Sequence, residues 1–279
     1  MLKRLLVSFE ILRPHNMLVA AFGVVAGYVI SSGRSVSEVW PTALFTALVT
    51  GAGNVINDYH DVHIDRINKP RRPLPSQRLT PKAAAILYAI STLLITAGAA
   101  VWLPSRVTAL IVVWQVALYV YARWAKRVFI LGNLLVASVA SSAFGAGGLL
   151  TGHGSAVVLP IGLAFVFVLS RELVKGAEDL EGDREAGVRT AAVVVGLERA
   201  VLWAAGMMLL LAAAMPVPAL ANYYGTLYLW VMEVTVVPGL LVASYLILRN
   251  PNKRVFNRVS WILKVGMFFG VLAMALGKI

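Results

Sequence analysis

Long apolar runs alternate with short polar segments along the whole chain. A membrane-spanning helix needs about 20 mainly apolar residues, and none of the runs shows the alternating polarity of a β-barrel strand. Nine runs reach the required length, at residues 16–32, 39–57, 82–103, 106–122, 129–151, 156–175, 190–214, 223–248 and 257–277. The pattern predicts an all-α fold, a polytopic membrane helical bundle of nine transmembrane helices in a single domain over residues 1–279.

The composition supports a membrane protein and limits its chemistry. Hydrophobic residues make up 59% of the chain and charged residues 14%, outside the usual range of soluble domains. The chain has no cysteine, so any metal site must use oxygen or imidazole ligands. Residues 1–15 carry scattered charge and lack a small-residue cleavage site, so we expect no removable signal peptide.

The basic residues predict the orientation in the membrane. A net charge of +12 is compatible with nucleic-acid binding, but basic cytoplasmic loops produce the same total. Of the 25 basic residues, all but Arg34, Arg106, Lys264 and Lys278 lie before the first run or in every second loop. The positive-inside rule then predicts a multi-pass cell-membrane protein with the N-terminus cytoplasmic, the C-terminus outside and no nucleic-acid partner. Lys264, inside the last run, is costly in lipid unless it reaches the interface.

Two of the cytoplasmic loops hold most of the 13 acidic residues. Asn57, Asp61 and Asp65 recur every four residues after the second run, and Asp179 and Asp183 repeat that spacing after the sixth. On a helix this spacing puts the side chains on one face, where carboxylates repel one another unless a cation neutralises them. Oxygen ligands of this kind select Mg²⁺, which commonly bridges to substrate phosphates. The alternative is a solvated patch that pairs with neighbouring basic residues.

Basic side chains close to these acids are candidates for diphosphate binding. Arg66, Lys69 and Arg72 follow the first acidic row, and Lys126 and Arg127 close the next cytoplasmic loop. Lysine and arginine are good partners for phosphate oxygens, although each also serves as an orientation determinant. The proline-rich segment 70–75 cannot be helical, and it stiffens this basic loop.

These motifs resemble those of the UbiA superfamily of intramembrane prenyltransferases. The resemblance lies in Asn-x-x-x-Asp-x-x-x-Asp, in Asp-x-x-x-Asp, in the Arg-Pro-Leu-Pro-Ser segment at 72–76 and in the Tyr-x-x-x-x-Lys-Arg loop at 121–127. It implies a nine-helix fold, a prenyl diphosphate substrate and Mg²⁺ held by Asn57, Asp61, Asp65, Asp179 and Asp183. The four aspartates are the expected catalytic residues. Gln77 departs from the more usual Pro-Ser-Gly, and we expect little effect on function.

Within the superfamily, segments 65–70, 171–175 and 178–183 most resemble the archaeal digeranylgeranylglyceryl phosphate synthases. That resemblance implies transfer of a geranylgeranyl group to geranylgeranylglyceryl phosphate in ether-lipid synthesis, at an active site near the cytoplasmic face. Candidates for binding this lipid-like acceptor are Arg13, Asn16, Glu172 and Lys175. Relatives that prenylate 4-hydroxybenzoate, protohaem or chlorophyllide share the aspartate motifs, so an aromatic acceptor remains the alternative.

Two other classes of protein compete with this interpretation. A transporter would place charge near the middle of its spans and break its helices there, whereas these acids lie at span ends on one side. A membrane phosphotransferase of the CDP-alcohol type would require a different aspartate pattern, which the sequence lacks. The favoured hypothesis is therefore an enzyme, and its oligomeric state is not indicated by the sequence.

Overall fold

The computed structural model describes residues 2–278, and within them the only regular elements are helices. The α-helices are α1 (Leu2–Leu12), α2 (Pro14–Ile30), α3 (Val36–His60), α4 (Val62–Asn68), α5 (Pro81–Trp102), α6 (Ser105–Arg123), α7 (Leu131–Ser141), α8 (Ala143–Thr151), α9 (Val158–Glu178), α10 (Leu180–Glu185), α11 (Ala191–Val194), α12 (Leu197–Ala214), α13 (Val217–Leu220), α14 (Thr226–Val231), α15 (Val237–Arg249) and α16 (Lys253–Leu276). Two 3₁₀ turns, η1 (Ala125–Arg127) and η2 (Gly154–Val157), and a π-helical segment, η3 (Met232–Val236), complete the described elements.

The predicted all-helical class is confirmed, and eight segments among the described residues are long and apolar enough to cross a membrane. Four of the eight join consecutive elements: α7 with α8, η2 with α9, α12 with α13, and α14 through η3 to α15. The first predicted run corresponds to α2, which has 17 residues and is shorter than the others.

The structure differs from the predicted runs at the start of α12 and in the segment before α2. The run predicted at 190–214 was expected to be a continuous helix, but α12 begins only at Leu197. Gly196, with φ 87°, separates it from the short α11, because a left-handed backbone conformation ends a right-handed helix. Helix α1 was not expected, and it places Arg13 at a bend before α2.

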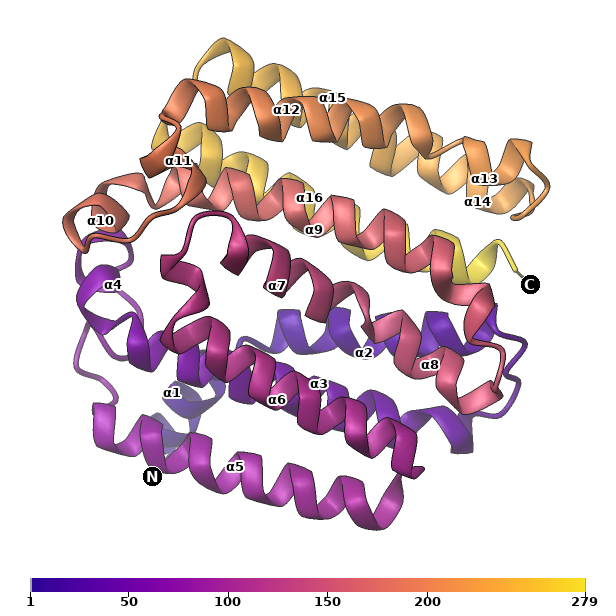
Figure 1. Ribbon diagram of the computed structural model, residues 1–279, viewed down its shortest axis with the longest axis horizontal. Helices are drawn as coiled ribbons and strands as arrows, with labels where there is room; N and C mark the ends of the chain where they lie inside the picture. The colour runs from indigo at the N-terminus through magenta and orange to yellow at the C-terminus, as the bar shows by residue number, and fades with distance from the viewer. Residues whose placement is uncertain (1, 279) are drawn as a thin grey trace.

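The long helices run side by side and create two distinct ends of the bundle (Figure 1). The short helices α4 and α10 lie together at one end, and the N-terminus is near that end. The C-terminus lies at the other end. The two acidic motifs begin at Asp61 and Asp179, 118 residues apart in the sequence, and they meet in space because α4 contacts α10.

Apolar side chains form both the interior and much of the exterior. One core cluster includes Met208 and Leu263 among the later helices, and a second includes Ile111 among the earlier ones. On the outside, Leu93 is 70% exposed and Leu210 is 68% exposed. A surface of this kind is stable in hydrocarbon and is not expected of a protein in water.

Close contact between α2 and α8 fixes the position of α2, which carries part of the site. A Cβ atom at Gly27 would lie 2.1 Å from the carbonyl oxygen of Phe144, and one at Gly147 would lie 2.2 Å from the carbonyl oxygen of Val24. Only glycine permits this approach. Small residues at such a crossing are typical of helices that pack in membranes.

Candidate active site

The two acidic motifs share one backbone arrangement. Asp61 joins α3 to α4 with φ −96° and ψ 4°, and Asp179 joins α9 to α10 with φ −93° and ψ 5°. In each motif the amide of the next aspartate donates to the carbonyl of the residue four before it, from Asp65 to Asp61 at 2.7 Å and from Asp183 to Asp179 at 3.0 Å. The four-residue spacing therefore keeps its helical hydrogen bond through each bend, and the side chains of a row stay on one face.

Helices α4 and α10 are held together by one asparagine. The side-chain amide of Asn68 donates to the carbonyl of Asp179 at 3.0 Å, and its oxygen accepts from the amide of Gly182 at 3.2 Å. A Cβ atom at Gly182 would lie 2.5 Å from Nδ2 of Asn68, so glycine is required for this contact. The next residue, Lys69, forms an ion pair with Asp179 through Nζ and Oδ1 at 2.8 Å.

The two motifs enclose a small polar cavity of about 70 Å³. Its lining contains all five side chains predicted to hold Mg²⁺, together with three of the five predicted diphosphate ligands: Lys69, Arg72 and Lys126. The other two, Arg66 and Arg127, are exposed and line neither this cavity nor the larger one next to it. The structure thus brings the aspartate rows together with only part of the predicted basic set.

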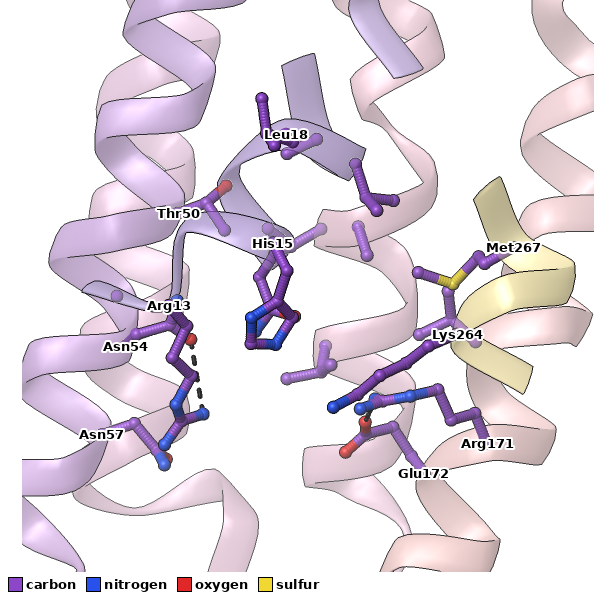
Figure 2. Close-up of a pocket in the computed structure, with 18 of the residues that line it drawn as sticks. Arg13, His15, Leu18, Thr50, Asn54, Asn57, Arg171, Glu172, Lys264 and Met267 are labelled. Atoms are coloured by element: carbon purple, nitrogen blue, oxygen red, sulfur yellow. Dashed lines mark hydrogen bonds and ion pairs between the residues drawn. The ribbon is translucent and has the colours of Figure 1, made fainter. Parts of the chain in front are cut away.

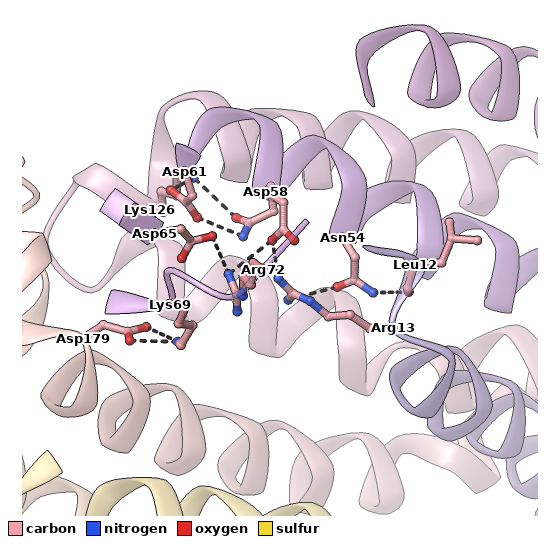
Figure 3. Close-up of polar contacts among 11 residues, drawn as sticks. Leu12, Arg13, Asn54, Asp58, Asp61, Asp65, Lys69, Arg72, Lys126 and Asp179 are labelled. Atoms are coloured by element: carbon pink, nitrogen blue, oxygen red, sulfur yellow. Dashed lines mark hydrogen bonds and ion pairs between the residues drawn. The ribbon is translucent and has the colours of Figure 1, made fainter. Parts of the chain in front are cut away.

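Cations in the polar cavity neutralise most of the carboxylates (Figure 3). Lys126 forms an ion pair with Asp61, whose Oδ2 also accepts from Nδ2 of Asn57 at 2.9 Å. Arg72 bridges Asp65 at 2.6 Å and Asp58 at 3.3 Å. Burial raises the pKa of Asp65 above its usual range, and burial lowers the pKa of Lys126. These groups are desolvated, so each charged form is stabilised mainly by the opposite charge of its ion-pair partner.

Asp183 differs from the other acids in the cavity. It is 8% exposed, and no hydrogen bond or ion pair from the side chains that the structure describes reaches its carboxylate. Burial, and then the neighbouring charge of Asp179, raise the pKa of Asp183 to about 7. A buried carboxylate without a partner is costly unless it is protonated or meets a cation.

The donor set suits a hard cation. Within the described chain, no three carboxylate or imidazole groups already surround one point as metal ligands, and lysine and arginine side chains pair with three of the aspartates. The side chains that converge are nevertheless oxygen donors, the type that Mg²⁺ prefers. The buried, unpartnered Asp183 is the position where an added cation would be stabilised most.

A larger cavity of about 770 Å³ continues from the polar one. Residues lining both cavities include Asn57, Lys69, Arg72, Tyr121, Glu172 and Lys175. Beyond this shared wall the lining becomes largely apolar, with contributions from Phe22, Val139, Phe144, Val168, Met267 and Phe268. The geometry therefore joins a charged compartment to one that accommodates a hydrocarbon chain.

All four predicted acceptor residues line the large cavity. Arg13, in a left-handed conformation with φ 53°, forms an ion pair with Asp58, which is 2% exposed. Asn54 accepts from Nη1 of Arg13 at 3.5 Å and donates to the carbonyl of Leu12 at 2.8 Å. Asn16 lies on the same wall, so the bend between α1 and α2 positions both predicted residues.

Several residues of the site were missed by the sequence reasoning. Asp58 and Asn54 share one face of α3 at a four-residue spacing, a signal that was available. Asn68, Tyr121 and Arg171 lie in segments that carried the family resemblance, but the sequence assigned them no role, and no sequence signal singled out His15. Glu172 pairs with Arg171, whose Nη1 donates to Oε1 at 2.7 Å.

Comparisons with known proteins agree with this geometry. A model described as the UbiA prenyltransferase family matches residues 20–272. A curated protein of Korarchaeum cryptofilum, named digeranylgeranylglyceryl phosphate synthase, is 34% identical over 96% of this chain and 95% of its own length. One of the same name from Methanothermobacter thermautotrophicus is 35% identical, with coverages of 96% and 95%.

Solved structures show the same fold. A structure described as a digeranylgeranylglyceryl phosphate synthase in membranes is 30% identical, has a TM-score of 0.73 and covers 99% of this chain and 98% of that chain. A UbiA homologue from Archaeoglobus fulgidus bound to GPP and Mg²⁺ is 18% identical, with a TM-score of 0.69 and coverages of 96% and 99%. The chain belongs to the UbiA prenyltransferase family.

Proposed function

We propose that this protein transfers a geranylgeranyl group from geranylgeranyl diphosphate to geranylgeranylglyceryl phosphate, forming digeranylgeranylglyceryl phosphate. The observation that carries the proposal is the junction of the two cavities, where the facing aspartates meet a large apolar compartment. A long hydrocarbon chain that carries a diphosphate group matches these two cavities, because one is charged and the other is largely apolar. Curated relatives that span nearly the whole chain bear the name of this activity.

The basic side chains of the polar cavity have a role in the departure of diphosphate. Asn57 and the four aspartates would hold Mg²⁺, which neutralises the diphosphate and makes it a better leaving group. Lys69, Arg72 and Lys126 now pair with aspartates. In the reaction they stabilise the charge that grows on the diphosphate as the C–O bond of the donor breaks.

The large cavity has a role in protecting the reacting carbon. As the bond to diphosphate breaks, C1 of the prenyl group becomes cationic, and water would capture it before the acceptor hydroxyl could form the new ether bond. The apolar lining of the large cavity, including Val139, Phe144 and Val168, excludes water from this position. The same surface holds the prenyl chain by burial of apolar area.

The acceptor is tested directly by transfer of label. Purified protein is given labelled geranylgeranyl diphosphate and Mg²⁺, with geranylgeranylglyceryl phosphate in one reaction and 4-hydroxybenzoate in another. Product from the glyceryl phosphate alone supports the proposed function. Product from the aromatic alone overturns the acceptor, and an absence of Mg²⁺-dependent product with either acceptor overturns the proposed activity.

The membrane topology is a second proposal. We infer nine spans in the cell membrane, with α2 as the first, the N-terminus and the polar cavity at the cytoplasmic face and the C-terminus outside. The 17 residues of α2 are at the lower limit for a span, and the distribution of basic residues supports the orientation.

Because the chain has no cysteine, single introduced cysteines test this topology cleanly. Asn250→Cys lies in the loop before α16, and Ser155→Cys lies in η2 at the opposite end of the spans. In intact cells, an impermeant maleimide should label Ser155→Cys alone. Labelling of Asn250→Cys alone would show that the protein has the opposite orientation in the membrane.

A further inference from the structure

A second group of basic side chains, two of them cationic, lies in the large cavity away from the aspartate rows. His15, Arg171 and Lys264 line this cavity but not the polar one, and they come from three different helices, α2, α9 and α16. Figure 2 shows Lys264 and Arg171 extending side by side into the cavity, with His15 facing them. We call these three residues the cavity cation cluster.

The positive charges of Arg171 and Lys264 are not fully paired with carboxylates among the described side chains. Arg171 donates to Glu172 at 2.7 Å, but its Nε is buried and has no hydrogen-bond partner in the described chain. Nζ of Lys264 lies 4.6 Å from the ring centre of Trp261, and the described residues place no carboxylate within ion-pair distance of it. A charged side chain inside a membrane bundle is costly unless it meets an opposite charge.

The remaining carboxylate on this wall does not neutralise the cluster. Glu178 accepts from Nδ2 of Asn257 at 3.3 Å and from Oγ of Ser260 at 3.1 Å. Lys175 adds another cation to the same lining. The wall therefore has a surplus of positive charge that an anionic ligand would satisfy.

The position of the cluster separates it from the diphosphate ligands. Arg171 precedes Asp179 by eight residues, which is about 12 Å along the axis of α9. On the far side, Leu18, Phe22, Val265 and Phe268 continue the lining as an apolar surface. The cluster thus lies between the polar cavity and a hydrocarbon compartment, where the charged group of a second lipid would fit.

We propose that the cavity cation cluster binds the phosphate monoester of the lipid acceptor. This inference rests on the proposed function, and it identifies how the enzyme distinguishes a phosphorylated acceptor from a neutral one. The phosphate accepts hydrogen bonds from Arg171, Lys264 and His15, while the apolar chain follows α2 and α16. The acceptor hydroxyl is then held on the side of the cluster that faces the aspartates.

Steady-state kinetics on Lys264→Met test the proposal. This substitution keeps an unbranched side chain and removes the charge. Lys264→Arg keeps the charge, and Arg258→Met removes an exposed charge from the same helix outside both cavities. Rates are measured with geranylgeranylglyceryl phosphate and with geranylgeranylglycerol, which lacks the phosphate, and the KM of the donor is measured separately.

The expected result is specific to the phosphorylated acceptor. Loss of a hydrogen bond to a charged group should raise its KM about tenfold or more in Lys264→Met. The KM values for the neutral acceptor and the donor should change less than about twofold. Lys264→Arg should retain the preference for phosphate, and Arg258→Met should behave as the unsubstituted protein.

Three outcomes would overturn the inference while leaving the proposed function intact. An unchanged acceptor KM excludes the subsite, and an equal loss with both acceptors indicates a structural role. A rise in donor KM alone assigns the cluster to diphosphate.

A second experiment distinguishes the acceptor phosphate from the phosphate of a bilayer lipid. Lipid binding is measured in nanodiscs with and without an anionic phospholipid. If a bilayer lipid occupies the cluster, Lys264→Met should lose lipid binding while its acceptor KM stays unchanged, which would also overturn the inference. If the unsubstituted protein makes no product from geranylgeranylglyceryl phosphate, the proposed function fails first and the inference fails with it.

Discussion

The side-chain amide of Asn68 donates a hydrogen bond to the backbone carbonyl of Asp179, 111 residues further along the chain. This contact, with the return bond from Gly182, sets the position of one aspartate row relative to the other. In the proposed mechanism, ligands from both rows meet one substrate, so small displacements here should lower the rate.

Asn68→Ala should lower kcat by about 10- to 100-fold, because the two rows lose the contact that aligns them. Gly182→Ala should have a similar effect, since its Cβ would lie 2.5 Å from Nδ2 of Asn68. Gly206→Ala is the matched control, because nothing lies within 4 Å of a Cβ at that position. Kinetics on the three purified variants check this, and normal kcat in Asn68→Ala would contradict the alignment role.

Lys69→Met should change the binding of metal and donor in opposite directions. Lys69 pairs with Asp179 at 2.8 Å, so its removal leaves that carboxylate available and should tighten Mg²⁺ binding in the absence of donor. The KM of the donor should rise about tenfold, because the diphosphate loses a charged partner. Metal titration and donor kinetics measure both effects, with the exposed Lys82→Met as control. Weakened Mg²⁺ binding with unchanged donor KM would refute the assignment.

Metal affinity should fall as the pH drops below about 7. The pKa of Asp183 in the metal-free protein is raised to about 7, mainly by burial, so its carboxyl gains a proton below this pH. Mg²⁺ must displace that proton, and the affinity therefore falls by up to about tenfold per pH unit. Titration with Mn²⁺ between pH 5.5 and 8 measures the slope. Asp183→Asn should bind more weakly with a flatter pH profile, and an equally steep profile in this variant would assign the titration to another group.

Gln77→Gly should stabilise the loop after α4. Gln77 has φ 60°, a conformation that costs most residues about 1–2 kcal/mol and glycine little. After the entropy of glycine in the unfolded chain is included, we expect a gain of roughly 0.5–1 kcal/mol, visible as a higher Tm in detergent. Gln77→Ala should give no such gain. A lower Tm for the glycine variant would show that the side chain of Gln77 contributes more than its backbone strain removes.

The aspartate rows were predictable because their geometry is local. A four-residue spacing determines a shared helix face, and the structure keeps the corresponding hydrogen bonds through the bends at Asp61 and Asp179. Helical geometry also explains the position of Arg66. It follows Asp65 directly, so it is rotated by about 100° around α4 away from the row, whereas Arg72 returns to Asp65 through the loop.

The cavity cation cluster was not predictable, because its members meet only through the packing of α2, α9 and α16. Lys264 was noted as costly, but its direction depends on which face of α16 meets the cavity. The start of α12 was misplaced for a related reason, since the apolar pattern of 190–214 continues across the break at Gly196. Hydropathy records burial in lipid or protein and does not record backbone conformation.

The central claim is that both aspartate rows act on one prenyl diphosphate, and formation of digeranylgeranylglyceryl phosphate across a Mg²⁺ titration tests it most directly. The unsubstituted protein should form product only with Mg²⁺, and Asp61→Asn and Asp183→Asn, from opposite rows, should each lose at least about a hundredfold in rate. Glu198→Gln, an exposed acid outside both cavities, should retain normal activity. Mg²⁺-dependent product at the normal rate in either aspartate variant would contradict the claim.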